Sequence, residues 1–245
     1  FINFFNNHRL FNFINRTQWK FVKGGSHKYI QAIISKNLFN YKINKCVKKI
    51  LRDKGKITII FNDNERFVAD KIILATHADQ ALNILDAPSK DEFQILSKFQ
   101  YSKNYAYLHS DTKFMPQRKA TWSSWNFQGK NSDDQSFSLT YWMNLLQNLQ
   151  GKKNFFLSIN PLDIPNYCYD KTTFEHPIFS LETLLAQKRI NEIQGNINTW
   201  FCGSYCGYGF HEDGIQSAAY VADLLGVKIP WNRPSNFFNR LQFKD

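Results

Sequence analysis

The sequence has few cysteines, no long apolar run and no opening segment of the secretory type. Its four cysteines in 245 residues are too few for a disulfide framework and indicate reduced thiols. No uninterrupted apolar stretch approaches the roughly 20 residues that a membrane-spanning helix needs. No charged segment followed by an apolar one opens the chain, so we expect a cytoplasmic protein without a transmembrane segment.

Acidic residues are also scarce relative to basic ones, which gives a net charge of +11. Such an excess raises the question of a nucleic-acid partner. The basic residues are scattered, however, and the one cluster, at residues 45–56, is interrupted by apolar residues as in a hairpin with a solvated basic face. No helix-turn-helix or RNA-binding signature accompanies it, so we expect no nucleic-acid partner.

The apolar content, 43% of residues with 16% aromatic, is ample for a globular core. The most informative segment is 199–225, where a short apolar strand at 200–202 precedes three glycines in seven residues and then a helix. Free backbone N–H groups at such a junction suit an electron-rich ligand, although a tight turn in any α/β protein gives the same pattern. The spacing predicts a buried helix stripe of Ile215, Ala218, Ala219, Ala222 and Leu225.

Two further segments accompany this one. Residues 19–29 place Gly24 and Gly25 before a helix, and residues 69–82 contain a strand that ends near Ala75. In this order, with a large insert before the third, the segments resemble the flavin-containing amine oxidase superfamily, and more narrowly a bacterial branch of FAD-dependent amine-oxidase-like proteins. The resemblance runs from about residue 19 to residue 231 and implies FAD as the cofactor.

One family feature is missing. The family carries a strand–Gly-x-Gly-x-x-Gly–helix unit at its N-terminus, and no such unit lies upstream of Gly24. Gly207 and Gly209 cannot replace it because the third glycine is absent. We therefore expect a C-terminal fragment of a longer protein, with a short natural variant as the alternative.

The expected fold class is α/β, of mixed α+β character. Residues 1–98 are expected to form the remainder of a Rossmann-like FAD-binding domain, interleaved with an antiparallel-sheet substrate domain at 99–196. Residues 197–245 would then return the chain to the FAD-binding domain.

The elements that we expect follow from local patterns. In the first region they are a helix capped by Ser26 with Ile30, Ile33, Ile34 and Leu38 inward, strands at 46–51 and 56–61, a turn at 62–65 and a buried strand at 72–75. A capping box at Ser89–Glu92 opens a helix with Phe93, Leu96 and Phe99 inward. In the second region they are strands at 105–109, 120–125, 137–143 and 155–159, and a returning helix at 181–193.

The resemblance implies a set of flavin-binding residues in the first two segments. Gly24 and Gly25 match the glycine pair near the flavin, where the absence of a Cβ lets the backbone approach the ring. Val47 matches a small apolar position at the adenine end. Ala75 and Thr76 match the end of the second dinucleotide motif.

The third segment completes the set. Gly203 matches the family glycine after the last strand, and Ser204 stands where many relatives have the acidic residue that binds a ribityl hydroxyl. Asp213, Gly214 and Ile215 match a Glu-Gly-Ala motif whose backbone N–H groups would face the flavin pyrimidine edge. The positive helix end there would stabilise the charge of the reduced ring.

The substrate pocket has five candidate residues. Trp122, Trp125, Tyr141 and Trp142 lie on adjacent expected strands, where one face packs the core and the other is a candidate cavity wall. His211 falls where amine oxidases place a tyrosine of their aromatic cage, and a histidine held in a turn is the alternative. No acidic residue accompanies these aromatics, which favours an apolar or acyl-chain substrate.

No metal site is expected, because Cys202, Cys206 and His211 lack a fourth ligand. The expected function is that of an FAD-dependent oxidoreductase, with hydride transfer from an amine, apolar or lipid substrate to flavin N5. No residue stands out as a dedicated general base. The alternative is a non-catalytic flavin-fold module that binds an apolar ligand or a partner protein.

Overall fold

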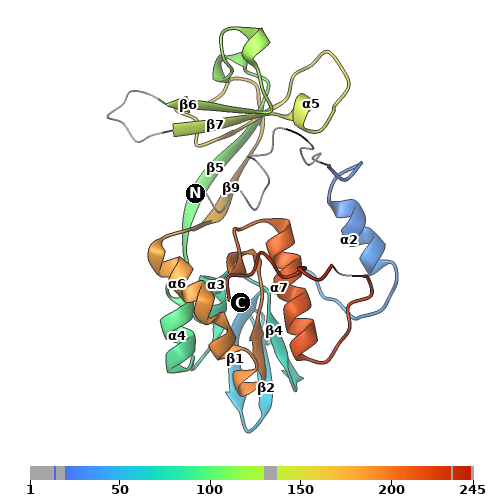
Figure 1. Ribbon diagram of the computed structural model, residues 1–245, viewed down its shortest axis with the longest axis vertical. Coiled ribbons are helices and arrows are strands. Elements are labelled where there is room, and N and C mark those ends of the chain that lie inside the picture. The colour runs from blue at the N-terminus through green and yellow to red at the C-terminus, as the bar shows by residue number, and fades with distance from the viewer. Residues whose placement is uncertain (1–13, 15–19, 130–136, 233, 244–245) are drawn as a thin grey trace. The chain divides into compact units, whose positions relative to one another are not determined.

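The computed structural model describes residues 14, 20–129, 137–232 and 234–243, which form two compact units. The first unit combines the described residues up to 100 with those from 177 onward, and the second spans 101–176 (Figure 1). The mixed α/β fold expected from the sequence is confirmed. Each unit has its own sheet system, so the two are described separately.

The helix α6 (Leu181–Arg189) belongs to the first unit, so this division differs from the sequence-based boundary at residue 196. Buried polar side chains hold α6 there: the Thr183 hydroxyl donates to the Lys98 carbonyl at 3.0 Å, and the Gln187 amide donates to the Tyr205 carbonyl at 2.7 Å. Its leucines at 181, 184 and 185 point outward. An apolar pattern alone therefore could not show what α6 packs against.

Three strands of the first unit form an antiparallel meander: β1 (Val47–Asp53), β2 (Lys56–Phe61) and β3 (Arg66–Ala69). Lys54 and Gly55 close the first hairpin with φ of +48° and +78°. Positive φ at both positions is what a two-residue turn of matching twist requires. The strands and the turn at 62–65 that the sequence predicted are confirmed.

A two-stranded parallel sheet joins distant parts of the chain. β4 (Ile72–Leu74) pairs with β10 (Thr199–Phe201), with Ile73 opposite Trp200, and every residue of β10 is buried. Both strands were expected from the sequence. Because they are parallel, the segments that follow them leave from the same edge, which is where ligands bind in open α/β sheets.

The helices of the first unit form largely where the sequence predicted them. α4 (Lys90–Leu96) begins with the expected capping box, since Ser89 and Glu92 exchange side chain–backbone hydrogen bonds of 3.2 and 2.6 Å. Leu96 and Phe99 are buried as expected, but Phe93 is 58% exposed, so its inward placement was wrong. α3 (Ala78–Ile84) lies between β4 and α4 in the chain.

Two expectations about α2 (His27–Ile34) were wrong, although the helix itself is present. Ser26 makes no side-chain cap bond, because its backbone is already helical (φ −63°, ψ −23°). Ile30, Ile33 and Leu38 of the expected inward stripe are exposed.

The buried stripe of α7 (His211–Leu224) also differs from the expected one. Ile215 and Ala218 are exposed, whereas the buried face contains Asp213, Gln216 and Ser217 together with Ala219 and Val221. The polar members are tolerated because each has hydrogen-bond partners inside the protein, described below. Of the expected stripe, Ala219 is buried and Leu225 packs against the core residues Trp200, Cys202 and Val221, whereas Ile215 and Ala218 are left open.

The second unit is a five-stranded sheet in the order β6-β7-β8-β5-β9. Its strands are β5 (Gln100–His109), β6 (Trp125–Gly129), β7 (Phe137–Trp142), β8 (Phe156–Ile159) and β9 (Cys168–Ile178). Three predicted strands are confirmed, and the pairings β5–β8, β6–β7 and β7–β8 are antiparallel.

Two features of this sheet were not predicted. The strand expected at 120–125 is a 3₁₀ turn, η2 (Lys119–Thr121), and β6 starts only at Trp125. β9 was missed because it is a largely exposed edge strand whose apolar residues do not alternate. The remaining short helices are α5 (Met143–Leu146), η1 (Thr112–Phe114), η3 (Ile190–Ile193), η4 (Asn196–Asn198) and η5 (Ser204–Cys206). Among the described residues, none of the helices combines the length and the apolar character needed to cross a membrane.

A buried ion pair ties three elements of the first unit together. Arg52 of β1 makes two bonds to the Glu92 carboxylate of α4, at 2.5 and 2.8 Å, and lies 3.3 Å from the Thr199 hydroxyl of β10. The Arg52 and Glu92 side chains are 3% and 0% exposed. Burial by itself raises the pKa of Glu92, but hydrogen bonds from Arg52 and from the Ser89 amide outweigh it and hold that pKa below its usual range.

We expect Arg52→Met to lower the free energy of unfolding by about 3–5 kcal/mol, because it leaves a buried carboxylate without its charged partner. Lys49→Met on the same strand is the control, since the Lys49–Asp86 pair is exposed, and it should cost about 1 kcal/mol or less. Urea denaturation measures both. The ionised Glu92 carboxylate has a lowered pKa in the folded protein. Its contribution to the free energy of unfolding is therefore fully present above the unfolded pKa of about 4.3 and is lost as pH falls through the folded pKa. Equal losses for the two variants would contradict this assignment.

Candidate functional site

A pocket of about 340 Å³ lies where β4 and β10 end. Ala75 follows β4, Cys202 follows β10, and the N-terminal part of α7 closes the remaining side. The lining residues are Ala75, Cys202, Gly203, Ser204, Gly209, Phe210, His211, Gly214 and Ala218. A volume in this range is typical of small-molecule sites, and the edge of the sheet is the one that binds ligands in open α/β folds.

The turn after β10 requires glycine at position 203. A Cβ on Gly203 would lie 2.7 Å from the ring of Tyr205, which is buried and packs edge to face on Phe99. The Gly203 amide donates to the Ser217 hydroxyl at 2.9 Å, which in turn donates to the Gly214 carbonyl at 2.8 Å. These contacts hold the turn directly against the first turns of α7.

A buried carboxylate organises the loop between this turn and α7. Asp213 has no exposed surface, and its Oδ2 accepts the backbone amides of Tyr208 at 3.1 Å and Phe210 at 2.7 Å. Its carboxyl group occupies the space beside Gly207, where a Cβ would come within 2.7 Å of it. The loop that bears Gly209 and Phe210 of the pocket wall is thus wrapped around one side chain.

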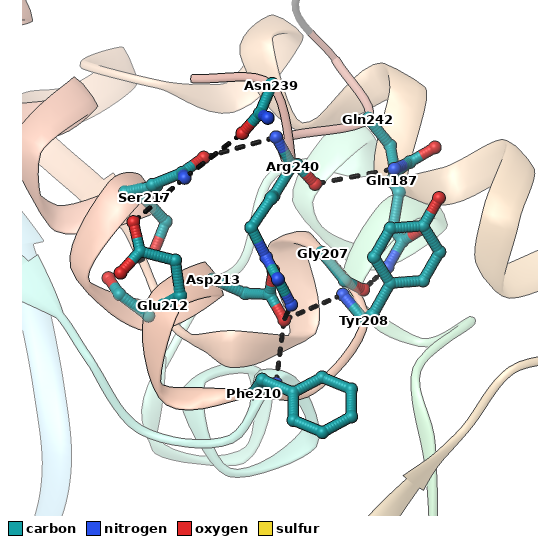
Figure 2. A network of polar contacts seen from close by, with 12 residues as sticks. Gln187, Gly207, Tyr208, Phe210, Glu212, Asp213, Ser217, Asn239, Arg240 and Gln242 are labelled. Carbon is teal, nitrogen blue, oxygen red and sulfur yellow. Dashed lines mark hydrogen bonds and ion pairs between the residues drawn. The ribbon is translucent and has the colours of Figure 1, made fainter. Parts of the chain in front are cut away.

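The C-terminal segment neutralises this carboxylate (Figure 2). The Arg240 guanidinium contacts both Asp213 oxygens, at 2.6 and 3.2 Å, and lies 5.6 Å from the centre of the Phe210 ring. Gln216 of α7 accepts the Arg240 backbone amide at 3.2 Å. A segment near residue 240 is therefore part of the support for a pocket built by residues 202–218.

The N-terminus of α7 has fewer free amides than the sequence led us to expect. The amides of Asp213 and Gly214 both donate to the Phe210 carbonyl, at 3.0 and 3.2 Å. Helix geometry leaves the amides of His211 and Glu212, the first two residues of α7, without a partner in the helix. The positive end of the α7 dipole is therefore presented at His211 and Glu212.

A second pocket, of about 380 Å³, lies beside the first and shares His211, Gly214 and Ala218 with it. Glu212 and Ile215 also line it, as does Tyr29 of α2. The Tyr29 hydroxyl is 3.3 Å from His211 Nε2, and the two rings meet edge to face. Sequence reasoning missed Tyr29, because 182 positions separate it from His211 and no local motif marks it.

The structure therefore brings together Ala75, Gly203, Ser204 and Gly214 of the expected flavin site, with His211 and Ile215 beside them. The Thr76 carbonyl lies 3.5 Å from the Cβ position of Gly203. Asp213 lines neither pocket; it binds the amides of the loop that forms part of the pocket wall. Gly24, Gly25 and Val47 line neither pocket; the two glycines form a turn before α2 with positive φ, and Val47 begins β1.

The two cysteines of this segment are unsuited to ionise. Burial raises the pKa of Cys202 to about 11, and burial together with the neighbouring Cys202 raises the pKa of Cys206 further. Both thiols are therefore neutral near pH 7. Among the described residues, no group of three or more His, Cys, Asp or Glu side chains has the geometry of a metal site.

A groove of about 310 Å³ lies on one face of the sheet in the second unit. Leu139, Tyr141, Leu157, Ile159 and Phe174 form its apolar bed, and Asn104, Asn160 and His176 its polar end. Burial raises the pKa of the Tyr141 phenol, which keeps its hydroxyl neutral. Of the four aromatic residues proposed from the sequence as pocket walls, Tyr141 lines this groove.

The three tryptophans of that set lie elsewhere in the second unit. Trp122 and Trp142 meet edge to face at 5.3 Å, and Trp122 also contacts the buried Phe156. Trp125 is 51% exposed and stands next to Tyr141. The expected alternation across 122–125 fails because Trp122 precedes β6.

The opposite face of this sheet buries a polar chain. His109 Nε2 is 2.8 Å from the Ser158 hydroxyl, which is 2.7 Å from that of Thr140. His109 Nδ1 accepts the Asp111 amide, so Nε2 carries the proton and cannot remove one from Ser158. Burial lowers the pKa of His109 against the opposing charge of Asp111, with a smaller lowering contribution from Lys113. These three hydrogen-bonded side chains form a structural network and not a nucleophile–base pair.

We expect Arg240→Met to lower the free energy of unfolding by about 3 kcal/mol, because the buried Asp213 carboxylate loses its cation. Hydrogen exchange of the Tyr208 and Phe210 amides should become faster, since both donate to that carboxylate. Urea denaturation and amide exchange measure the two effects.

Arg189→Met is the matched control for this experiment. Arg189 pairs with Glu192 on the surface, where both side chains are more than 40% exposed, so its loss should cost about 1 kcal/mol or less. If both variants behave alike, Asp213 does not depend on Arg240.

A comparison with solved structures found proteins whose fold is similar to that of this chain. The chain is similar to the CLA-producing fatty acid isomerase from P. acnes (TM-score 0.55, 15% identity, 82% of this chain and 51% of that one). It is similar to a protein described as a protoporphyrinogen oxidase from Exiguobacterium sp. 255-15 (TM-score 0.63, 10% identity, 89% and 54%). It is also similar to putrescine oxidase bound to putrescine (TM-score 0.56, 11% identity, 83% and 53%).

The chain spans about half the length of these proteins, and the similarity is one of fold. A comparison with curated proteins found no match. The family model for flavin containing amine oxidoreductases matches residues 3–146, which is more than half of the chain. This match to a flavin-containing family confirms the resemblance seen in the sequence, and with it FAD, the cofactor that the resemblance implied. The protein belongs to the family of flavin containing amine oxidoreductases.

Proposed function

We propose that the protein is an FAD-dependent oxidoreductase of the amine-oxidase type that acts on an apolar substrate, and that the pocket after β4 and β10 holds part of the flavin. One observation carries this proposal. Segments that the sequence motifs marked separately, at Ala75, at 203–204 and at 211–215, converge on that pocket and its neighbour in the first unit.

The residues of the pocket fit a flat ring. A Cβ on Gly214 would make one contact of ordinary van der Waals distance, with the Ser204 nitrogen at 3.8 Å, and would clash with nothing. A glycine at this point therefore leaves room for a ligand that the protein itself does not fill. The exposed Ala218 and Ile215 continue this surface along α7 and offer an apolar wall.

The charges at the pocket also fit a flavin. The amides of His211 and Glu212 and the positive end of α7 favour an electron-rich ring edge. Arg240 offsets the buried negative charge of Asp213 behind the wall. Ser204 is the polar residue in the position where many relatives have an acid, and we propose that it binds a ribityl hydroxyl in place of that acid.

A bound FAD would supply the oxidising power to remove a hydride from a substrate C–H bond; the substrate would release a proton, and the two electrons would pass on to dioxygen or another acceptor. The chain's own part is to hold and orient. Tyr29 and His211 lie at the shared edge of the two pockets, and their 3.3 Å contact holds the imidazole in place. With this contact in place and a neutral imidazole, one of the two groups keeps a proton for a polar atom of a substrate. It is the Tyr29 hydroxyl if His211 Nε2–H donates to it, and His211 Nδ1–H if the hydroxyl donates to Nε2.

The substrate class is inferred from the groove of the second unit. Its lining contains no carboxylate, so nothing in it would pair with an ammonium group, whereas its bed of leucine, isoleucine and aromatic side chains suits a hydrocarbon chain. Among the structurally similar proteins, one acts on fatty acids by its name and another was solved with putrescine. The groove favours the first kind of substrate. The free thiols, two of them exposed, fit a reducing compartment, and we propose the cytoplasm.

The alternative is a non-catalytic module of flavin fold that binds an apolar ligand or a partner protein. The specific observation in its favour is that Ser204, and not an acid, occupies the ribityl position. Anaerobic reduction by substrate decides between the two, because a module would hold flavin without reducing it.

Gly214→Val is expected to lower the affinity for FAD by at least about tenfold, because a branched side chain would enter the space that the ring needs. A Cβ at this position meets no atom closer than 3.8 Å, and both alanine and valine favour a helix over glycine. The unfolding midpoint of the flavin-free variant should therefore not fall. Flavin absorbance after gel filtration reports retention.

Gly214→Ala serves as the graded control, with an intermediate loss of retention expected. Unchanged absorbance and unchanged reduction potential in Gly214→Val would show that the pocket is not the flavin site.

Anaerobic flavin bleaching should be supported by long alkyl or acyl compounds and not by short amines. Each methylene buried in the groove should contribute roughly 0.8 kcal/mol, or about fourfold in apparent affinity. A panel from short amines and amino acids to unsaturated or cyclopropane lipids makes the comparison. Bleaching by small cationic amines alone would exclude a lipid substrate, and bleaching by none would support the non-catalytic module.

A further inference from the structure

The polar end of the groove in the second unit is built from three side chains on different elements. Asn104 belongs to β5, Asn160 follows β8, and His176 belongs to β9. All three line the groove together with its apolar bed. The hydrogen bonds among them determine which atoms remain available to a ligand.

The orientation of Asn160 follows from the backbone. The Tyr105 amide donates to Asn160 Oδ1 at 2.9 Å, and an amide N–H can donate only to the oxygen. The other end of the side chain, Nδ2, therefore faces Asn104 and donates to its Oδ1 at 2.8 Å.

The orientation of Asn104 follows in turn. Its Oδ1 accepts from Asn160, and its Nδ2 donates to the Ser102 carbonyl at 2.9 Å, which can only accept. The same Nδ2 lies 3.0 Å from His176 Nδ1. Because Nδ2 is a donor, His176 Nδ1 must be the acceptor, and the proton of the neutral imidazole is on Nε2.

The other ring nitrogen of His176, Nε2, thus carries a hydrogen that it can donate at the edge of an apolar groove. The Tyr141 hydroxyl, held neutral by burial, is a second group in the lining that can donate. The amide oxygens of Asn104 and Asn160 are already used as acceptors. A groove whose polar groups offer donors, with no carboxylate among its lining residues, matches a ligand whose polar group only accepts.

We propose that this groove binds an unbranched alkyl carboxylate, a fatty acid, with its chain on the bed of Leu139, Leu157 and Ile159 and its carboxylate on His176 Nε2–H. The role of this ligand as substrate rests on the proposed function, but its binding does not, since the groove lies within one unit. His176 is then the residue that selects an acid over an amine of the same length.

The test is isothermal titration of the whole protein with decanoate, decanol and decylamine below their micellar concentrations. We expect the wild-type protein to bind decanoate most tightly and decylamine least. His176→Phe keeps a ring of similar size but removes the donor, so affinity for decanoate should fall by about tenfold or more, with decanol and decylamine changing less than about threefold. His176→Gln supplies a comparable N–H and should stay within about threefold of wild type for decanoate.

Two further variants locate the site. Leu157→Trp fills the groove and should weaken all three ligands, whereas Thr173→Ala, at an exposed position of β9 outside the groove lining, should weaken none. Decylamine binding as tightly as decanoate, equal losses of all three ligands in His176→Phe, or no effect of Leu157→Trp would each overturn the assignment.

Flavin content measured in the same preparations separates this proposal from the preceding one. A protein that binds decanoate through His176 but holds no FAD contradicts the proposed function and leaves the groove assignment standing. A protein that holds FAD but ignores decanoate contradicts the groove assignment alone.

Discussion

The candidate flavin pocket depends on the contacts of one buried carboxylate, that of Asp213. It fixes the backbone of residues 207–210 through two amides, it requires glycine at position 207, and it attaches the C-terminal segment through Arg240. Removing one partner of a buried ion pair lowers the free energy of unfolding far more than replacing both charged residues by apolar residues of similar size. A change in the loop, in the helix start or in the C-terminal segment is therefore expected to disturb the other two.

Both compact units place polar groups inside and leave apolar side chains outside at the surfaces that we connect with ligands. In α7 the buried face contains Asp213, Gln216 and Ser217, while Ile215 and Ala218 face the pockets. In the second unit, His109, Ser158 and Thr140 are buried on one side of the sheet, and the apolar groove lies on the other. Satisfied polar networks specify a particular arrangement more sharply than apolar contacts do, which suits surfaces that must present a shaped apolar wall.

The two proposed sites make different demands on the same chain. The pocket of the first unit needs backbone close to a ring and a positive helix end, and it obtains them from glycines and from the N-terminus of α7. The groove of the second unit needs a hydrocarbon surface with a directed donor, and it obtains the direction from a relay of two asparagines. An enzyme that oxidises a lipid would need both, whereas a binding module would need only one.

The sequence by itself determined the elements whose signals are local. The capping box at Ser89, the hairpin of the strands at 46–51 and 56–61, the strands on either side of the large insert and the glycine motif at 203–214 were all predicted, because each depends on residues within a few positions of one another. The family could be recognised for the same reason. Ala75, Gly203 and Gly214 were assigned to one site from these motifs, and the structure brings them to one pocket.

Only the tertiary structure decided which faces are buried. The stripes of α2 and α7 were assigned inward from their apolar spacing, and this failed for most of the α2 stripe and for Ile215 and Ala218 of α7. Beside Ala219 and Val221, the buried side of α7 contains polar residues whose partners, such as Arg240, are distant in the sequence. Tyr29, β9 and His176 escaped sequence reasoning because their roles come from contacts across 72 or more positions or from an edge strand without alternation. A hydrophobic pattern reports that a face is apolar, but whether protein or ligand covers it depends on what the folded chain brings there.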